Sequence, residues 1–493
     1  MNVNPITRLD YPDPDVIRVE DTYYMVSTTM HFMPGCEILQ SFDLVHWEHA
    51  TYVYETLDHT DAQQLKSGQN IYGQGMWAAS LRYHEGRFYI CFVANDTRKT
   101  YLYTSEKIDG PWKKQLIEGF YHDGSLLFDE DGRNYIVYGN DEIWITELNE
   151  DLTAPKKGGL HRLLVSDHKN PELGYEGSHI QKINGYYYIF LIHSLRDRWM
   201  RTEACFYSDS LEGEFTGGDV LCDDRGYCGQ GVAQGGIVDT PDGKWYAMLF
   251  QDSGAVGRIP ILVPVTWKDH FPFFGQNGHV PEEIEVHSTR PEYIYQPLVG
   301  SDDFCNGLLP RWQFNHDPDP RYYHLDALQG TYTITTREVC TELTQAVNTL
   351  TQRMSYPSCA AEVTVDASAL KEGDVAGLCA LQGCYAAVGI TKHHGKYEVL
   401  MLDKKEDGIL DMTERTVVES HQMDFRLEAD FCNMKDEARC YYRVNKGDWL
   451  PIGTVHKLYF KLDHFTGCRF GLFCYAAEET GGSACFRDFK YYD

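Results

Sequence analysis

The first 300 residues alternate short apolar or aromatic runs with turns rich in Gly, Asn and Asp, and helical periodicity is scarce. This pattern predicts an all-β fold. One block recurs five times: a polar turn, then a Tyr, then an apolar run. The Tyr residues of successive blocks lie 65, 46, 53 and 58 residues apart, at Tyr24, Tyr89, Tyr135, Tyr188 and Tyr246.

The spacing of these blocks is typical of β-propeller blades that carry insertions. The turn before each Tyr, such as Asp131-Gly132 or Asn184-Gly185, is a hairpin signal. Five copies therefore predict a five-bladed β-propeller over residues 1–298, with each Tyr on the second strand of its blade. A series of ordinary hairpins in a sandwich is the alternative. The lack of clear copies after residue 300 favours the propeller.

The pattern changes beyond residue 300. Alternating stretches such as Tyr332-Thr333-Ile334-Thr335 replace the Tyr blocks, and ten of the 15 Cys lie in this half. Alternation of this kind predicts a β-sandwich. We therefore expect a second domain over residues 302–493, joined to the first by a connector over residues 290–300.

Composition narrows the class of partner. The formal net charge is −29, from 44 Lys+Arg and 73 Asp+Glu, which argues against nucleic acid or an anionic membrane as a partner. A hydrophobic fraction of 43% excludes disorder as the main state. The 34 Tyr, 23 Phe and 9 Trp can build sheets and can stack on the flat faces of sugars.

The sequence shows no recognisable targeting segment, which predicts a cytoplasmic protein. The first residues show neither a basic segment nor an apolar core of a signal peptide, and no apolar run is long enough to span a membrane. The odd number of Cys, with no Cys-x-x-Cys pair, indicates free thiols in a reducing compartment.

Candidate chemistry comes from the first strand of each blade, which lines the central channel. Eleven or twelve residues before the Tyr of each block lie Asp13, Trp77, Asp123, Glu176 and Gln234. Three carboxylates around one axis suit glycosidic bond cleavage, which needs an ionised base and a protonated acid. A third carboxylate can raise the pKa of the acid by repulsion between like charges. The flat face of Trp77 suits a sugar ring.

Simpler interpretations of the same residues remain open. The matched offsets can arise by chance in an acidic chain, Asp13 between two prolines can be a turn residue, and Glu176 can be a solvated loop residue. An acidic cluster can also bind a hard cation such as Ca²⁺.

At these positions the sequence resembles family 43 glycoside hydrolases, the five-bladed propeller β-xylosidases and α-L-arabinofuranosidases. The resemblance covers the whole chain, including a C-terminal β-sandwich of jelly-roll, concanavalin-like type. Its carriers are Asn4-Pro5-Ile6, Tyr11-Pro12-Asp13-Pro14, Phe32-Met33-Pro34-Gly35, Met76-Trp77-Ala78, His122-Asp123-Gly124-Ser125-Leu126, Tyr175-Glu176-Gly177-Ser178-His179 and Val256-Gly257-Arg258.

The resemblance implies roles. Asp13 matches the general base, Glu176 matches the general acid, and Asp123 matches the carboxylate that orients the acid and tunes its pKa. The implied substrate-binding residues are Trp77, Arg258, Met30, Phe32 and Gln234. Arg258 could instead form a surface salt bridge, and Trp77, Met30 and Phe32 could be plain core. Inversion at the anomeric carbon implies carboxyl groups about 6.5–9.5 Å apart.

The resemblance also implies an exo-acting enzyme that releases xylose or arabinose from short xylo- or arabino-oligosaccharides. A loop of the sandwich should close the pocket. No cofactor is expected for the chemistry, although Ca²⁺ could occupy the channel; Gln234 stands where many members carry a His near that ion. The oligomeric state is left open, with a homo-oligomer as one alternative. The rival hypotheses are a non-catalytic carbohydrate-binding propeller and a Ca²⁺-dependent structural or interaction protein.

Overall fold

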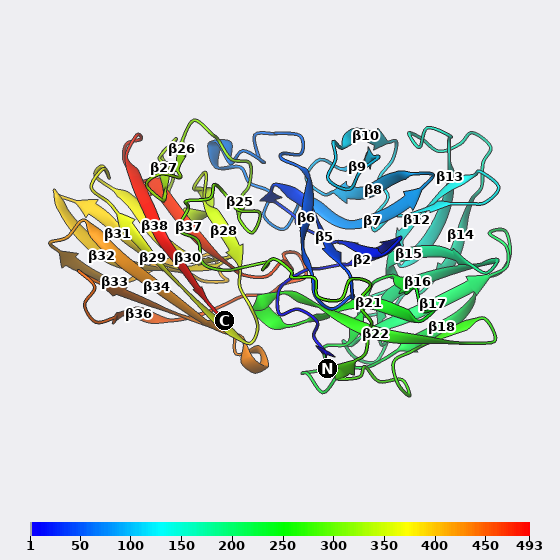
Figure 1. The fold of residues 1–493 in the computed structure, drawn as a ribbon. Coiled ribbons are helices and arrows are strands. Elements are labelled where there is room, and N and C mark those ends of the chain that lie inside the picture. Colours follow the sequence, from blue (N-terminus) through cyan, green and yellow to red (C-terminus); the bar gives the residue numbers. More distant parts are fainter. Residues whose placement is uncertain (1) are drawn as a thin grey trace.

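The computed structural model describes residues 2–493, and almost all its regular structure is β-sheet (Figure 1). Five antiparallel sheets follow one another along the chain as five blades. Blade 1 contains β2 (Asp15–Val19), β3 (Thr22–Val26), β5 (Gly35–Ser41) and β6 (Glu48–Tyr54). Blade 2 contains β7 (Met76–His84), β8 (Arg87–Ala94), β9 (Lys99–Ser105) and β10 (Lys113–Ile117). Blade 3 contains β11 (Ser125–Phe128), β12 (Asn134–Asn140), β13 (Glu142–Leu148) and β14 (His161–Ser166).

The last two blades follow the same plan. Blade 4 contains β15 (Glu176–Ile183), β16 (Tyr186–Ser194), β17 (Arg201–Ser208) and β18 (Thr216–Leu221). In blade 5 the inner position is shared by β19 (Val232–Ala233) and β20 (Ile237–Asp239), which both pair with β21 (Trp245–Asp252). Outside β21 lie β22 (Arg258–Lys268) and β23 (Phe271–Phe274). The predicted five-bladed propeller is confirmed.

The repeated Tyr residues lie on the second strand of each blade, as predicted. Tyr135, Tyr188 and Tyr246 are buried, in β12, β16 and β21. Their hairpin turns use glycine where the backbone has positive φ, as at Gly132 (φ 80°). An L side chain rarely adopts that conformation, so glycine fits this turn. Turn chemistry and buried aromatic rings together explain why the repeat is visible in the sequence.

The second half forms a β-sandwich of two packed sheets. One sheet has the order β33-β32-β31-β30-β37-β28-β25-β4. Its strands are β33 (Leu410–Val418), β32 (Lys396–Lys404), β31 (Tyr385–His393), β30 (Asp374–Leu381), β37 (Arg469–Ala476), β28 (Leu350–Arg353), β25 (Gln313–Asn315) and β4 (Phe32–Met33). The other has β26 (Tyr323–Asp326), β27 (Thr331–Thr335), β38 (Ser483–Tyr492), β29 (Ser358–Asp366), β34 (Gln422–Asp430), β35 (Glu437–Arg443) and β36 (Leu450–Lys457). The predicted sandwich is confirmed.

The propeller and the sandwich are joined by more than the connecting chain. Strand β4 comes from the propeller half but pairs with β25, so that a propeller segment extends a sandwich sheet. In the other direction, the segment between β36 and β37 reaches the propeller, where the Gly467 N–H donates to Asp10 at 2.7 Å. A Cβ at Gly467 would lie 2.0 Å from the Val256 carbonyl oxygen, so only glycine allows this approach. The predicted boundaries at 298 and 302 remain a prediction.

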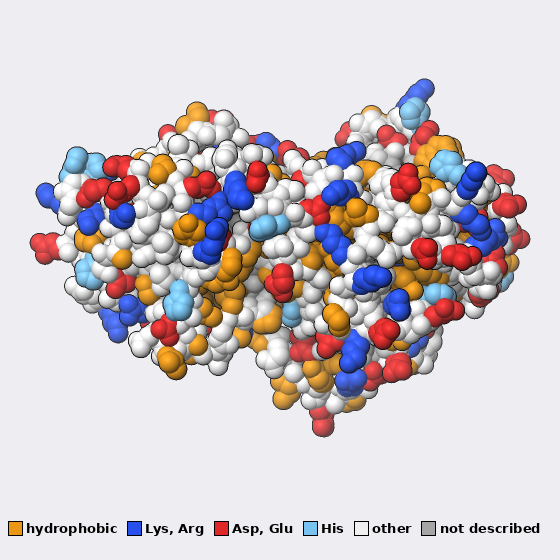
Figure 2. All heavy atoms as spheres, turned by 90° about the horizontal axis from the view of Figure 1, so that it is seen from above, with side chains coloured by type: hydrophobic (Ala, Val, Ile, Leu, Met, Phe, Trp, Pro, Cys, Tyr) orange, Lys and Arg blue, Asp and Glu red, His pale blue; other side chains and the backbone are white. Residues whose placement is uncertain are grey.

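The remaining regular elements are short. Strand β1 (Asn2–Val3) pairs with β24 (Glu283–Ile284), and four 3-10 turns lie at η1 (Lys66–Gly68), η2 (Gly254–Val256), η3 (Leu343–Gln345) and η4 (Cys432–Met434). Over residues 2–493, none of these turns has the length and apolar character needed to cross a bilayer. Figure 2 shows acidic and basic side chains interspersed over the face seen from above.

Candidate active site

One cavity of about 190 Å³ lies where the five blades meet the sandwich, and every blade contributes to it. All five residues that the repeat places on inner strands line this cavity. The sandwich adds two apolar side chains. The lining residues are Asp13, Trp77, His122, Asp123, Asn140, Leu173, Glu176, Trp199, Arg201, Gln234, Arg258, Leu462 and Phe465.

The backbone is strained at three of these positions. Asp13 (φ 52°), Asp123 (φ 48°) and Gln234 (φ 58°) all have left-handed backbone, in blades 1, 3 and 5. This conformation costs a non-glycine residue roughly 1–2 kcal/mol, and such strain is concentrated at functional sites. Gly177 also has positive φ (64°), and a Cβ there would lie 2.7 Å from the Gln234 side chain. The blades therefore turn their inner strands sharply where they present polar groups to the cavity.

Asp13 is held by two donors on one side of the cavity. It is 3% exposed and accepts hydrogen bonds from Thr28 Oγ1 at 2.5 Å and Arg258 Nη1 at 2.6 Å. Arg258 is 5% exposed, so the alternative of a surface salt bridge is wrong. These two contacts fix the position of the carboxylate.

A chain of alternating charges continues behind Asp13. Arg258 Nε donates to Asp252 at 3.2 Å, and the other Asp252 oxygen accepts from Arg201 Nε at 2.6 Å. Burial alone would raise the pKa of Asp252, but the charges of Arg201 and Arg258 lower it below its usual value. Asp252 therefore stays ionised and fixes both guanidinium groups of the cavity wall.

Asp123 and Glu176 also line the cavity, and His122 lies within 4 Å of both carboxylates. The closest ligand atoms of the three residues lie within 4.8 Å of one another. His122 Nε2 is 3.6 Å from Asp123 Oδ2 and 3.8 Å from Glu176 Oε2. Asp123 also accepts from the Gly177 N–H at 3.0 Å, and Glu176 accepts from Asn140 Nδ2 at 2.8 Å.

These groups shift one another's pKa values. Burial, opposed by the charge of His122 and assisted by Glu176 and Asp13, raises the pKa of Asp123 to about 6. The charge of Asp123 is the main cause that raises the pKa of His122 to about 9, against burial. Burial also acts to raise the pKa of Glu176. However, the hydrogen bond and charge of His122, with Arg201 and Arg258, lower it overall.

The direction at Glu176 differs from the expectation that a third carboxylate raises the pKa of the acid. The physical reason is His122, a cation that the motif contains but that sequence reasoning left without a role. In the free site the cations near Glu176 outweigh burial, so its ionised form is favoured.

Aromatic and apolar side chains close the cavity. The rings of Trp77 and Phe465 meet edge to face with centroids 5.0 Å apart. Phe465 and Leu462 come from the segment between β36 and β37 of the sandwich, as the predicted loop requires. Leu173 and Trp199 complete the wall from blade 4.

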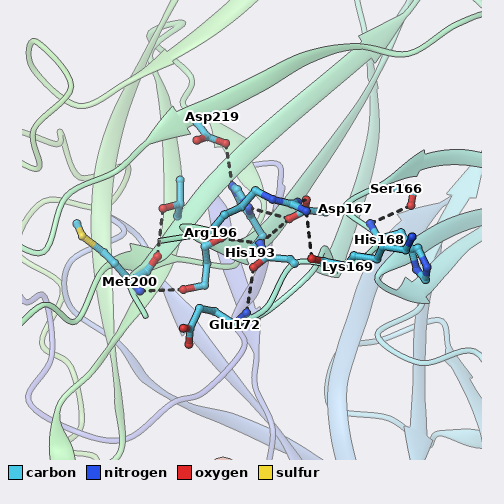
Figure 3. A network of polar contacts seen from close by, with 12 residues as sticks. Ser166, Asp167, His168, Lys169, Glu172, His193, Arg196, Met200 and Asp219 are labelled. Carbon is cyan, nitrogen blue, oxygen red and sulfur yellow. Dashed lines mark hydrogen bonds and ion pairs between the residues drawn. The ribbon is translucent and has the colours of Figure 1, made fainter. Parts of the chain in front are cut away.

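A polar network holds the two loops that carry Leu173 and Trp199 (Figure 3). Asp167 contacts Arg196 and lies 3.2 Å from His193 Nδ1, and His193 Nε2 is 2.8 Å from Asp219 in β18. The Ser194 N–H donates to the Leu173 carbonyl at 3.0 Å. The loops over residues 167–174 and 195–200 are thus tied to each other and to the blade.

Met30 and Phe32 are the two predicted binding residues that the structure does not bring to this cavity. Both are buried, but neither is among the lining residues. Phe32 lies in β4 at the junction with the sandwich, where the Arg469 guanidinium is 3.4 Å from its ring centre. Met30 Sδ accepts from Thr466 Oγ1 at 3.4 Å, one residue after Phe465. Met30 therefore contacts the segment that carries Phe465, whereas Phe32 lies at the interface between propeller and sandwich.

Several lining residues were missed by sequence reasoning. Asn140, Arg201, Leu173 and Trp199 lie at strand ends or in loops outside the repeated block. Leu462 and Phe465 lie more than 160 residues after the last block. Only His122, adjacent to Asp123 in its motif, carried a local signal.

His122, Asp123 and Glu176 are also the described residues with the spacing to chelate a metal ion. Carboxylate and imidazole ligands suit several divalent cations. The same three groups are the ones with the chemistry of acid catalysis, so metal binding there would compete with that chemistry.

Comparison with known families covers both halves of the chain. A family model described as glycosyl hydrolases family 43 matches residues 3–272. A second, described as a beta xylosidase C-terminal concanavalin A-like domain, matches residues 301–492. Each match coincides with one of the two β-structures described above.

Individual relatives agree. A beta-xylosidase of Formosa agariphila is 27% identical over 97% of this chain and 88% of its own length. A non-reducing end alpha-L-arabinofuranosidase of Bacteroides ovatus, BoGH43B, is 26% identical over 66% of this chain and 63% of its own length.

Among solved structures, a bifunctional GH43-CE protein of Bacteroides eggerthii has a TM-score of 0.92 and 42% identity over all of this chain. This chain spans 64% of that protein's length. An engineered GH43 glycoside hydrolase, described as both an endo-xylanase and an exo-arabinofuranosidase, has a TM-score of 0.89 and 27% identity over 99% of both chains. On the match to its family model and the fold that carries the site, the chain belongs to glycosyl hydrolase family 43.

Proposed function

We propose that this glycoside hydrolase removes single xylose or arabinose units from the ends of short xylo- or arabino-oligosaccharides. One observation carries the proposal: Asp13 and the Asp123–Glu176 pair face a single 190 Å³ cavity that Phe465 and Leu462 help to enclose. A cavity this small, with side chains of the sandwich on one wall, suits one terminal sugar better than the middle of a polymer. The names of the Formosa and Bacteroides ovatus relatives support the two candidate sugars.

The reaction that we propose is a single inverting displacement, as in the rest of the family. Asp13, paired with Arg258, takes a proton from a water molecule as the water oxygen attacks the anomeric carbon. Glu176 donates a proton to the glycosidic oxygen as the bond to the anomeric carbon breaks. The products are a free sugar of inverted configuration and the shortened oligosaccharide. The proton on Asp13 then returns to solvent, and Glu176 takes up a proton from solvent.

Glu176 must be protonated for this step, although the free site favours its ionised form. A bound sugar excludes water from the cavity, which strengthens the effect of burial and favours the neutral acid. Asp123 adds repulsion between like charges once it is ionised. Substrate binding therefore favours the protonated acid, against the charge of His122.

A purely carbohydrate-binding propeller is the alternative that the sequence left open. Family membership and the complete set of Asp13, Asp123 and Glu176 in one cavity favour the hydrolase.

The experiment that tests the function separates the two catalytic roles. Asp13→Asn should reduce kcat on aryl xylosides and aryl arabinofuranosides by about 10²–10⁴-fold with every leaving group. Glu176→Gln should show a loss of similar size with a poor leaving group and near wild-type turnover with dinitrophenol, which leaves without a proton. Proton NMR of the first product should show the inverted anomer.

Asp131→Asn is the matched control, because Asp131 is an exposed acid in the turn between β11 and β12 of blade 3. Wild-type turnover by Asp13→Asn, or a retained anomer, would overturn the proposed function.

A further inference from the structure

Arg82 crosses the channel beyond the cavity. It lies in β7 of blade 2, and its side chain is 12% exposed. It does not line the active-site cavity but lines a separate hollow of about 410 Å³, together with Leu126, Ile180 and Ile237 from the inner strands of blades 3, 4 and 5. Arg82 therefore lies between the carboxylates and the far end of the channel.

Every N–H of the Arg82 guanidinium has an acceptor. A guanidinium has five N–H donors in a fixed plane. Two acceptors are side chains and three are backbone carbonyls of inner strands. The contacts are Nε to the Leu126 carbonyl at 2.9 Å, Nη1 to Asp15 at 2.7 Å and to the Leu81 carbonyl at 2.6 Å, and Nη2 to Ser125 Oγ at 2.7 Å and to the Ile180 carbonyl at 3.2 Å.

Apart from the Leu81 carbonyl, which belongs to β7 itself, these acceptors lie in the chain segments that carry the three carboxylates. Asp15 follows Asp13 by two residues, Ser125 follows Asp123 by two, and Ile180 follows Glu176 by four. We propose that Arg82 is the positioning residue of the active site: one guanidinium joins the inner strands of blades 1, 3 and 4 and so fixes the relative places of the three carboxylates. The inference relies on the proposed function for the catalytic roles of the three carboxylates. The contacts of Arg82 on which it is argued do not depend on that function.

The contacts of Arg82 also test whether the Ca²⁺ expected in the channel could bind beside this residue. Ca²⁺ takes carboxylate, hydroxyl and carbonyl oxygens. Here those oxygens, on Asp15, Ser125 and two strand carbonyls, already accept hydrogen bonds from the guanidinium. The second Asp15 oxygen is 3.1 Å from His179 Nδ1.

A divalent cation among these oxygens would lie beside a positive charge and would lose its ligands to it. The oxygens around Arg82 therefore do not fit Ca²⁺, because at this level of the channel the chain itself supplies the cation. Burial alone would raise the pKa of Asp15, but the charge of Arg82, followed by His179, lowers it, which agrees with a buried ion pair.

The test begins with the wild-type enzyme. Dialysis against EDTA should leave both Tm and kcat unchanged, and added Ca²⁺ should restore nothing. A fall in Tm that Ca²⁺ reverses would overturn the proposal without touching the proposed function, because the readout is thermal unfolding.

Substitution of Arg82 tests the positioning role. Arg82→Ala should lower Tm by about 5 °C, because it leaves Asp15 buried with one partner fewer. It should lower kcat at least about tenfold, because carboxylates displaced by a fraction of an ångström lose their alignment. Millimolar guanidinium should recover part of kcat in Arg82→Ala and none in the wild type, a response that a merely structural defect does not give.

Two further variants serve as controls for the substitution of Arg82. Arg133→Ala removes an exposed Arg that is also paired with an Asp, and it should change neither Tm nor kcat. Arg82→Lys keeps the charge but not the five planar donors, so it should fold and retain only part of kcat. Full activity of Arg82→Lys and Arg82→Ala, or of Arg82→Lys alone if Arg82→Ala does not fold, would overturn the positioning role.

Discussion

The guanidinium of Arg258 lies 3.6 Å from the centre of the Phe465 ring. Arg258 belongs to blade 5 and pairs with Asp13, whereas Phe465 belongs to the sandwich half. A cation over a desolvated aromatic face contributes about 2 kcal/mol. The sandwich thus completes the environment of the residue that holds the proposed base.

Phe465→Ala should therefore weaken catalysis from the sandwich side. It removes the aromatic cover of Arg258 and opens the cavity to water, so kcat/KM should fall about 10- to 100-fold. Steady-state kinetics on an aryl xyloside would measure this. Phe273→Ala, which changes a half-exposed Phe on β23, is the control and should leave kcat/KM unchanged. Equal kinetics for the two variants would contradict the role of Phe465.

His122→Gln should shift the pH dependence of catalysis upwards. The raised pKa of His122, about 9, means that His122 is charged at neutral pH and lowers the pKa of Glu176. Without that cation, Glu176 keeps its proton to higher pH, so the upper limb of the profile of kcat/KM against pH should rise by about one unit. His279→Gln, in an exposed side chain, should leave the limb in place.

Thermal unfolding gives a second measure of His122. The folded pKa lies above the ordinary value of 6.5, so the stability contributed by this group is complete below pH 6.5 and is lost as the pH rises through about 9. The Tm advantage of the wild type over His122→Gln should shrink across that window. A constant difference would show that His122 is not charged in the folded enzyme.

Asp123→Asn should produce the opposite shift. Removing this negative charge takes away the repulsion between the Asp123 and Glu176 carboxylates, so that Glu176 loses its proton at lower pH. The upper limb of the pH–rate profile should then move to lower pH, as a property of the coupled group rather than of one residue. An unchanged limb would remove the tuning role of Asp123.

Asp252→Asn should destabilise the fold as well as the site. The side chain keeps its shape but loses the charge between Arg201 and Arg258, both buried. Breaking a buried pair costs about 3–5 kcal/mol, so the free energy of unfolding should fall by that order. Denaturant titration measures this. Asp239→Asn breaks a more exposed pair with Arg18 and should cost at most about 1 kcal/mol.

Asp167→Asn should affect substrate binding more than chemistry. Asp167 ties the loop that carries Leu173 to the loop that carries Trp199 (Figure 3). Looser loops should raise KM several-fold with kcat nearly unchanged, the pattern of lost uniform binding. Asp197→Asn, an exposed acid in the second loop, is the control. A fall in kcat at constant KM would contradict this role.

The sequence predicts the architecture well because the blades repeat. Each repeated Tyr follows a hairpin turn, and counting back from it locates Asp13, Asp123 and Glu176 in one cavity. Local sequence patterns do not predict contacts between segments that only the tertiary structure brings together. Phe465 reaches the cavity from a distant loop, Arg201 begins a largely buried strand, and Phe32 pairs into a sandwich sheet. The lowered pKa of Glu176 depends on three cations that only the fold brings together.

The pairing of β4 with β25 has a consequence for protein engineering. A strand from near the start of the chain forms the edge of a sheet built mainly from its second half. Truncation near residue 300 would therefore leave an unpaired strand edge on one fragment and a shortened sheet on the other, a template for aggregation. Chimaeras between relatives should exchange the two halves as a matched pair, and circular permutation should spare this seam.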